Sequence, residues 1–251
     1  GTGFTTADEV WFNGVPAVFV IDNDGQISAT VPAGATTGPI TIINAGCDTV
    51  ISSGTFTINT NATFNLTMLI EGFYDGLGGL TPALLNSGVG LSATECDTIY
   101  VELRDQLTPA NVLASGTAVL NTAGQANLTF PGSVIGQNGY IAVFHRNAVQ
   151  TWSDLVSFTA STTYNFTTAA TQAFGSNMIA VAPGVYAFYS GDLSPQDEFI
   201  DILDQGVIDN DIFNFASGYV VSDLDGSGFV DIVDQSIVDN NIFNFIGSVH
   251  P

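Results

Sequence analysis

The sequence predicts a mainly β protein that ends in a small α-helical module. Apolar and polar residues alternate over much of residues 1–190, in short segments separated by glycine-rich turns. After residue 190 this pattern gives way to two acidic loops, each followed by a segment that we expect to be helical. A chain of 251 residues with 45% hydrophobic content holds two or three domains of about 100 to 150 residues. We expect domains at residues 1–60, 61–190 and 191–251.

The first domain is predicted to be a sandwich of short strands. Strand-like segments occupy residues 10–14, 17–21 and 27–31. A turn at residues 22–25 separates the second segment from the third.

Four segments of this domain resemble the IPT/TIG type of immunoglobulin-like domain: residues 1–4, 12–17, 31–34 and 38–42. The resemblance implies a role in adhesion or spacing. In that family a strand normally precedes the first of these segments. We therefore expect this chain to be the C-terminal portion of a longer protein, with the other domains of that protein as partners.

The second domain is predicted to be an antiparallel β-sandwich, because its apolar residues alternate with polar neighbours. The expected inward-facing residues are Phe64, Leu66, Met68, Ile70, Ile99, Val101, Leu103, Ala126, Leu128 and Phe130. Residues 69–74, 97–105, 145–147 and 151–153 resemble a sandwich found in surface proteins of gliding, type IX-secreting bacteria. No linker separates this domain from the terminal module, so we expect the two to form one rigid unit.

The strongest motif is a twelve-residue loop at residues 223–234 with oxygen donors spaced for a calcium ion. A hard cation of this kind takes six to eight oxygen ligands, and Gly228 stands at the sixth position, where the chain must turn with positive φ. The expected ligands are Asp223, Asp225, Ser227, Asp231 and Asp234, with the backbone carbonyl of Phe229. A helix is expected to begin near Asp231.

A second copy of this pattern lies thirty residues earlier and is one residue longer. Glu198 replaces the glycine of the turn, so we expect a weaker or distorted site. The expected ligands of this first loop are Asp192, Ser194, Asp197, Phe199, Asp201 and Asp204.

Two loop-and-helix units of this length resemble the dockerin module, a tandem calcium-binding repeat of secreted bacterial proteins. The resemblance implies that loop positions 10 and 11 help to recognise a cohesin partner. Here these positions are apolar in both copies: Ile202, Leu203, Ile232 and Val233. We expect them to be buried in a core. If they are exposed instead, docking to a cohesin becomes the favoured reading.

The charge of the chain excludes several partners. Its formal net charge of −22 comes from 24 acidic residues against Arg104 and Arg146, and such a surface repels nucleic acids and anionic membranes. Half of the acidic residues lie from Asp192 onward without any lysine or arginine. No transmembrane segment or signal peptide is found in the sequence. Calcium loops of low affinity are typical of an extracellular protein, secreted or at the surface of a bacterium.

The inventory of catalytic groups is thin, and we expect no enzymatic activity. His145 lies in a strand-like segment and is expected to be a hydrogen-bonded structural residue, and His250 is next to the end of the chain. Cys47 and Cys96 are expected either to form an interdomain disulfide or to be two separate thiols. Surface glycans are a further possible partner, through Trp11, Trp152, Tyr74 and Tyr100.

The leading hypothesis is a non-enzymatic C-terminal segment of a large secreted or cell-surface protein, acting as adhesin, spacer or filament. One alternative is a dockerin that docks a cohesin-like protein in an extracellular complex. Another is a filament subunit in which a neighbouring copy completes a sheet by strand exchange, because a bare sheet edge invites a strand.

Overall fold

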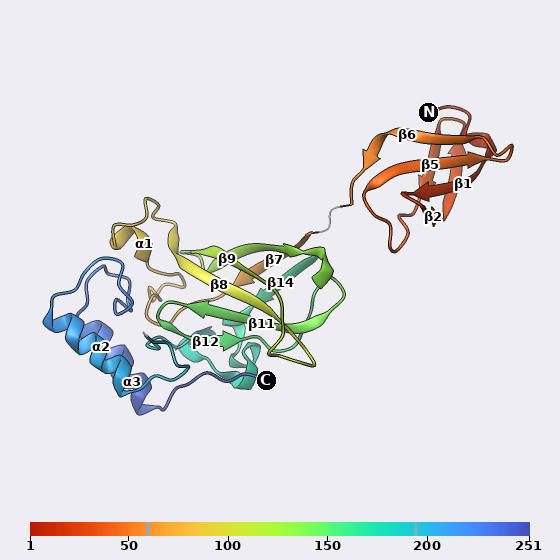
Figure 1. Cartoon of the computed structure of the whole chain (residues 1–251). Helices are drawn as coiled ribbons and strands as arrows, with labels where there is room; N and C mark the ends of the chain where they lie inside the picture. Colours follow the sequence, from red (N-terminus) through yellow and green to blue (C-terminus); the bar gives the residue numbers. More distant parts are fainter. Residues whose placement is uncertain (59–60, 194) are drawn as a thin grey trace. The chain divides into compact units, whose positions relative to one another are not determined.

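The computed structural model describes residues 1–58, 61–193 and 195–251. The chain is mainly β, with predominantly antiparallel sheets, and divides into two compact units, Gly1–Thr60 and Asn61–Pro251 (Figure 1). Within the described residues, no helix combines the length and the hydropathy that crossing a membrane requires.

The first unit contains a four-stranded sheet and a separate two-stranded hairpin. The sheet has the order β2-β1-β5-β6, and β3 pairs with β4 around the predicted turn. The bounds of its elements are η1 Phe4–Thr6, β1 Ala7–Phe12, β2 Val15–Ala17, β3 Phe19–Asn23, β4 Gln26–Ala29, β5 Gly38–Asn44 and β6 Thr49–Phe56.

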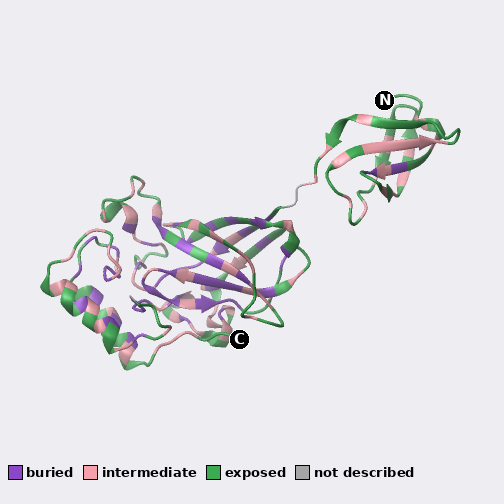
Figure 2. Cartoon of the chain, in the orientation of Figure 1, coloured by how far each residue is buried: buried purple, intermediate pink, exposed green. Residues whose placement is uncertain are grey.

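The core of the first unit is small. Val10 and Phe12 are its fully buried large side chains, and the ring of Phe12 lies edge-on to Phe56 at 4.9 Å. Most other residues of this unit are exposed or half-buried (Figure 2). An apolar cavity of about 460 Å³ is lined by Phe4, Ile40 and these same core residues. An apolar hollow is therefore lined by residues of both the four-stranded sheet and the hairpin.

The second unit begins with a sandwich of two larger sheets. One sheet has the order β10-β7-β14 and the other β12-β11-β8-β9, with β13 also paired to β11. One pairing differs from the expected antiparallel pattern, because β14 runs parallel to β7. The bounds are β7 Asn61–Thr67, β8 Glu95–Asp105, β9 Val112–Asn121, β10 Gln125–Pro131, β11 Asn138–His145, β12 Ala148–Trp152, β13 Val156–Ser157, β14 Ser161–Asn165, β15 Ile179–Ala182 and β16 Val185–Ala187.

Short helical turns connect these strands: α1 Ala83–Asn86, η2 Gly132–Val134, η3 Phe166–Thr168, η4 Ala170–Gln172 and η5 Phe174–Ser176. All ten residues that alternation placed inside the sandwich are buried, and Phe64 packs edge-on against Phe130 at 5.1 Å. The predicted inward faces of these strands are therefore confirmed, as the purple strands of Figure 2 show.

The chain ends in two helices of twelve residues, α2 Ile202–Phe213 and α3 Ile232–Phe243. Each begins after an aspartate that caps it, Asp201 for α2 and Asp231 for α3, so the expected start of the second helix is confirmed. A second apolar cluster holds this module together and includes Val149 of β12. The core of the module therefore extends onto β12 of the sandwich, and both parts belong to one compact unit.

The predicted burial of loop positions 10 and 11 is wrong. Ile202 is 67% exposed, Leu203 65%, Ile232 69% and Val233 47%. The core is filled by other positions of the repeat instead. Positions 2 and 8 of each loop and one residue in the middle of each helix supply it: Leu193, Ile200, Ile208, Leu224, Val230 and Val238. Positions 10 and 11 are the first two residues of each helix, and their side chains face the solvent instead of that core.

The two cysteines are free thiols. Cys47 in the first unit is exposed, and Cys96 in the second is buried. Burial in the apolar core raises the pKa of the Cys96 thiol to about 12, which keeps it protonated and unreactive. Of the two arrangements expected for these residues, the structure has the separate thiols.

Candidate metal centre

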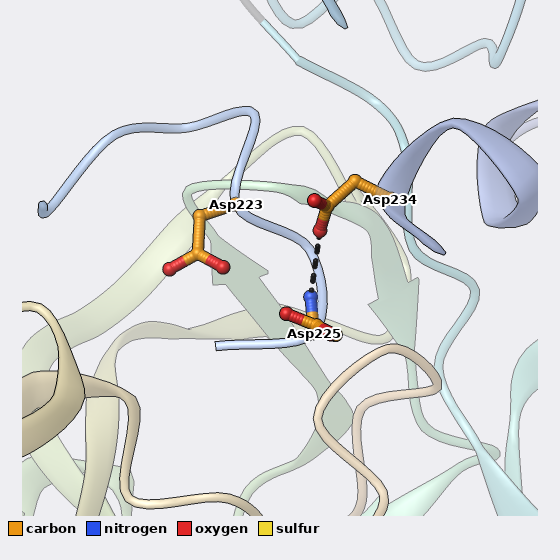
Figure 3. A group of neighbouring side chains, drawn as sticks. All are labelled: Asp223, Asp225 and Asp234. Atoms are coloured by element: carbon orange, nitrogen blue, oxygen red, sulfur yellow. Dashed lines mark hydrogen bonds between the residues drawn. The ribbon is translucent and has the colours of Figure 1, made fainter. Parts of the chain in front are cut away.

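Three carboxylates of the second loop gather around one small space (Figure 3). One oxygen from each of Asp223, Asp225 and Asp234 lies within 4.8 Å of the others. Asp223 and Asp225 come from the beginning of the loop, and Asp234 from the first turn of α3. These are three of the six residues that the spacing predicted as ligands.

The backbone of the loop is shaped by its glycines. Gly228 has φ of +88°, and a Cβ at this position would lie 2.6 Å from the carbonyl oxygen of Asn86. Its N–H donates to Asp223 Oδ2 at 3.1 Å. Glycine is therefore required here by both the backbone angle and the close approach of the sandwich.

Backbone N–H groups hold Asp234 in place. Its Oδ1 accepts hydrogen bonds from Leu224 at 2.7 Å and from Asp225 at 3.1 Å, and its Oδ2 accepts one from Asp231 at 2.8 Å. The start of the helix and the start of the loop are thus tied to the same carboxylate. This is how a loop of twelve residues brings its first and last positions together.

The electrostatics of the cluster favour a bound cation. Asp223 and Asp234 are both fully buried. The pKa of the Asp223 carboxyl is raised to about 7, chiefly by burial. The charges of Asp234 and Asp225 contribute to the rise, and a hydrogen bond from Gly228 opposes it. Burial likewise raises the pKa of Asp234 to about 6. Three acids held this close destabilise their own charged forms unless a cation lies between them.

One atom of the cluster fits a metal ligand particularly well. Asp223 Oδ1 is buried and has no hydrogen-bond partner within the part of the chain that the structure describes. A buried carboxylate oxygen without a partner is costly, and a coordinated hard cation removes that cost. The donor set consists of oxygens alone, which suits calcium or magnesium and not the softer transition metals.

The other three predicted ligands of this loop are occupied differently. Ser227 Oγ donates to the carbonyl of Phe229 at 3.1 Å, and the carboxylate of Asp231 accepts from the N–H of Val233 at 2.7 Å. Asp231 therefore serves first as the cap of α3. Position 9 of such loops often reaches its ion through water, which is compatible with this geometry.

The first loop has the same plan with fewer converging oxygens. Asp204 Oδ1 accepts from Leu193 at 2.7 Å and Asp192 Oδ1 from Asp197 at 3.2 Å, as in the second loop. Burial raises the pKa of Asp192 to about 7. Among the described residues, however, its acidic side chains form no cluster like that of the second loop. Ser194, another predicted ligand, lies outside the described residues.

Two further predicted ligands of the first loop act within the loop itself. Asp197 Oδ1 accepts from the N–H of Phe199 at 3.2 Å, and Asp201 caps α2 through the N–H of Leu203 at 2.7 Å. Glu198 has φ of +75°, so it adopts the left-handed conformation that the glycine of the other loop adopts.

A buried charge network beneath the second loop was not predicted. Asp97 Oδ2 lies 2.8 Å from Arg146 Nε and 3.2 Å from His145 Nε2, while its Oδ1 accepts from Tyr219 Oη at 2.5 Å. Arg146 also donates to the carbonyl of Val220. Burial opposes ionisation of Asp97, but these partners outweigh it and hold its pKa well below the usual range.

This network joins the sandwich to the segment that leads into the metal centre. His145 is buried and lies beside Asp97, which is compatible with the structural role predicted for it. The sequence signal that could have indicated this network is the position of Arg146 next to His145. Arg146 is one of only two arginine or lysine residues in a strongly acidic chain.

Comparison with known proteins gives distant likenesses of structure alone. No protein-family model matches the chain, and no curated protein matches it either. Two mutants of a type II cohesin–X-dockerin complex from Acetivibrio cellulolyticus are similar in structure. The C-terminal interface mutant has a TM-score of 0.44 at 16% identity, covering 72% of this chain and 94% of that chain. The N-terminal interface mutant has 0.40 at 15%, covering 73% and 95%. Likenesses this distant carry no functional argument.

Proposed function

We propose that this chain is a non-enzymatic part of a secreted or cell-surface bacterial protein, in which a calcium ion at the second loop keeps the terminal module folded. The proposal is supported chiefly by the convergence of Asp223, Asp225 and Asp234, together with the unpartnered buried oxygen of Asp223. The first unit then serves as a spacer or an adhesive domain.

Calcium explains how so acidic a module remains compact. Two like charges 4 Å apart repel by about 4 kcal/mol at an effective dielectric constant near 20. Twelve acidic residues lie from Asp192 onward, without a lysine or arginine among them. A divalent ion at the point where three carboxylates meet offsets the largest of these repulsions, so binding of the ion is coupled to folding.

Hydrogen exchange with excess calcium and with chelator tests the proposal. We expect amide protection in residues 223–245 to fall when calcium is removed, while strands β7, β8 and β11 keep theirs. Asp223→Asn should abolish the calcium response, and Asp8→Asn, an exposed acid of the first unit, should leave it intact. Protection that is identical with and without calcium would refute a structural ion.

A second candidate function is docking to a cohesin-like protein. The exposure of Ile202, Leu203, Ile232 and Val233 favours it, because exposed apolar side chains at these positions are available to a partner. The direct measurement is titration of the chain with a purified cohesin module by calorimetry. Binding that Ile232→Asp removes without loss of folding would establish docking, and no heat of binding would reject this partner.

A further inference from the structure

The terminal module exposes large apolar side chains at matched positions of its two repeats. The pairs are Phe199 with Phe229, Ile202 with Ile232, Leu203 with Val233, Phe213 with Phe243, and Phe215 with Phe245. Single exposed apolar residues are ordinary on a protein surface. Five such pairs in one small module are more than this ordinary exposure explains, because both repeats expose an apolar residue at the same five positions.

Phe215 and Phe245 are unfavourable for folding on two counts. Each follows the C-terminus of its helix with positive φ, +54° and +56°, where glycine is the residue that avoids strain. Their side chains are 89% and 93% exposed, so packing does not repay that strain. A costly conformation that occurs in both repeats, with the ring left exposed each time, indicates a role outside the fold.

The helices α2 and α3 lie side by side (Figure 1), and the hydrogen bonds between them show that they run antiparallel. Gln205 in the first turn of α2 donates to Asp239 of α3 at 2.8 Å. Gln235 in the first turn of α3 donates to Asp209 of α2 at 2.7 Å. Each helix therefore begins beside the end of the other.

Two equivalent apolar patches result from this register. Ile232 and Val233 lie at the same end as Phe213 and Phe215, and the symmetry of the repeats repeats this arrangement at the other end. A helix of twelve residues is about 18 Å long, so both patches fit within one interface of ordinary size.

Charge decides the kind of partner. The acids Asp209 and Asp239 lie between the two patches, and no lysine or arginine occurs from residue 147 to the end of the chain. A second copy of this chain would bring another net charge of −22 against the same surface. An occupant must supply both apolar contacts and cations.

We propose that the exposed ends of α2 and α3 form a docking surface for another protein, anchored by Phe215 and Phe245, whose contacting face is apolar and flanked by lysine or arginine. This inference rests on the proposed calcium-held module, because the surface exists only while both helices are folded. It adds anchors and a partner charge to the cohesin-like docking considered above, which concerned loop positions 10 and 11 alone.

The first measurement separates a binding role of the anchors from a folding role. In the double variant Phe215→Gly with Phe245→Gly, the strained backbone is relieved and two exposed rings are removed. We expect its melting temperature in excess calcium to be unchanged or higher. A clear fall would show that the rings stabilise the fold, and this would overturn the proposal.

The second measurement uses two synthetic amphipathic helices with the same leucine face, one flanked by lysines and one by glutamates. We expect the chain to bind the lysine peptide at physiological salt. The glycine double variant should bind it at least about tenfold more weakly. Leu91→Ser with Leu107→Ser is the matched control, since it removes two exposed apolar side chains elsewhere in the same unit. It should bind like the unmodified chain.

Several results would overturn the inference. These are equal binding of the glutamate peptide, unchanged binding by the glycine variant, and an equal loss in the leucine control. A dimer in sedimentation that the glycine variant disperses would make a second copy the occupant instead. Chelator separates this proposal from the calcium site: peptide binding that survives with unchanged amide protection contradicts the ion but leaves the docking surface standing.

Discussion

The two loop-and-helix repeats share nearly all their local contacts and differ at one turn. Both helices begin with the same reciprocal capping contacts, and both loops hold their last aspartate through backbone N–H groups. Gly228 makes the turn of the second loop, whereas Glu198 and an additional residue occur in the first. A three-carboxylate cluster is found in the second loop alone among the described residues. Whether the carboxylates of a loop converge therefore depends on the backbone of its turn as much as on the number of acidic residues.

The first loop is held by the chain around it. Glu198 and Ile200 pair with the segment after α3, through Ser248 N–H to the Glu198 carbonyl at 2.6 Å and Ile200 N–H to the Ile246 carbonyl at 2.9 Å. Gln196 also donates to the carbonyl of His145 in the sandwich at 2.8 Å. The second loop has matching contacts, from Gly218 N–H to the Gly228 carbonyl at 2.8 Å and from Val230 N–H to the Ala216 carbonyl at 3.1 Å. Backbone pairing with the neighbouring segment is therefore common to both loops.

The largest expected difference comes from removing the last aspartate of each loop. In excess calcium, Asp234→Ala should lower the free energy of unfolding by about 3 to 5 kcal/mol, because it leaves buried acids without their shared ion. Asp204→Ala should cost about 2 kcal/mol, mainly through lost hydrogen bonds to a charged group. Chemical denaturation monitored by hydrogen exchange measures both. Equal losses would show that the two loops bind calcium alike.

The charge network under the second loop should matter nearly as much. Arg146→Met leaves the buried Asp97 without its guanidinium partner, and we expect a loss of about 3 kcal/mol. Arg104→Met is the control, since Arg104 pairs with Glu102 on the sandwich, whereas Arg146 pairs with Asp97. If Arg146→Met destabilised the protein no more than this control, the network would not be what joins the module to the sandwich.

The same network predicts acid sensitivity. The pKa of Asp97 is lowered in the folded protein, so its contribution is present above the unfolded value of 3.8 and is lost as pH falls below it. Stability measured between pH 5 and about 3 should therefore fall more steeply in the unmodified chain than in Arg146→Met. The difference between the two proteins reports on the acids whose pKa Arg146 lowers, which are Asp97 and also Asp223. Parallel pH profiles would show that Arg146 does not lower the pKa of Asp97.

The sequence predicted what depends on local spacing. Alternation identified the inward residues of β7, β8 and β10, and the thirty-residue offset identified both loops and the start of α3. It failed where long-range packing decides. Ile232 is exposed because Leu224 and Val230 already fill the core, and Asp97 meets Tyr219 across 122 residues of chain. The parallel pairing of β14 with β7 likewise has no local signal.

Replacing Gly228 tests whether the turn of the second loop is what allows its carboxylates to converge. Gly228→Ala puts a Cβ 2.6 Å from the Asn86 carbonyl oxygen at φ of +88°. We expect it to cost about 2 kcal/mol and to weaken calcium binding, since left-handed backbone is unfavourable for alanine. Gly206→Ala is the control, because the Cβ of that helical residue meets open space. If Gly228→Ala left the calcium affinity unchanged, calcium binding would not depend on the conformation of this turn.

The reciprocal change should give the smallest effect and the opposite sign. Glu198→Gly relieves a left-handed backbone of φ +75°, which should stabilise the first loop by about 1 kcal/mol. It also removes the contact of Glu198 with His250, but both side chains are well exposed, so that pair contributes little. If the turn limits the first loop, the variant should bind calcium there more tightly, which calorimetry in the Asp234→Ala background would resolve. A more stable variant without added calcium binding would show that the extra residue, and not Glu198, keeps the first loop from forming a site.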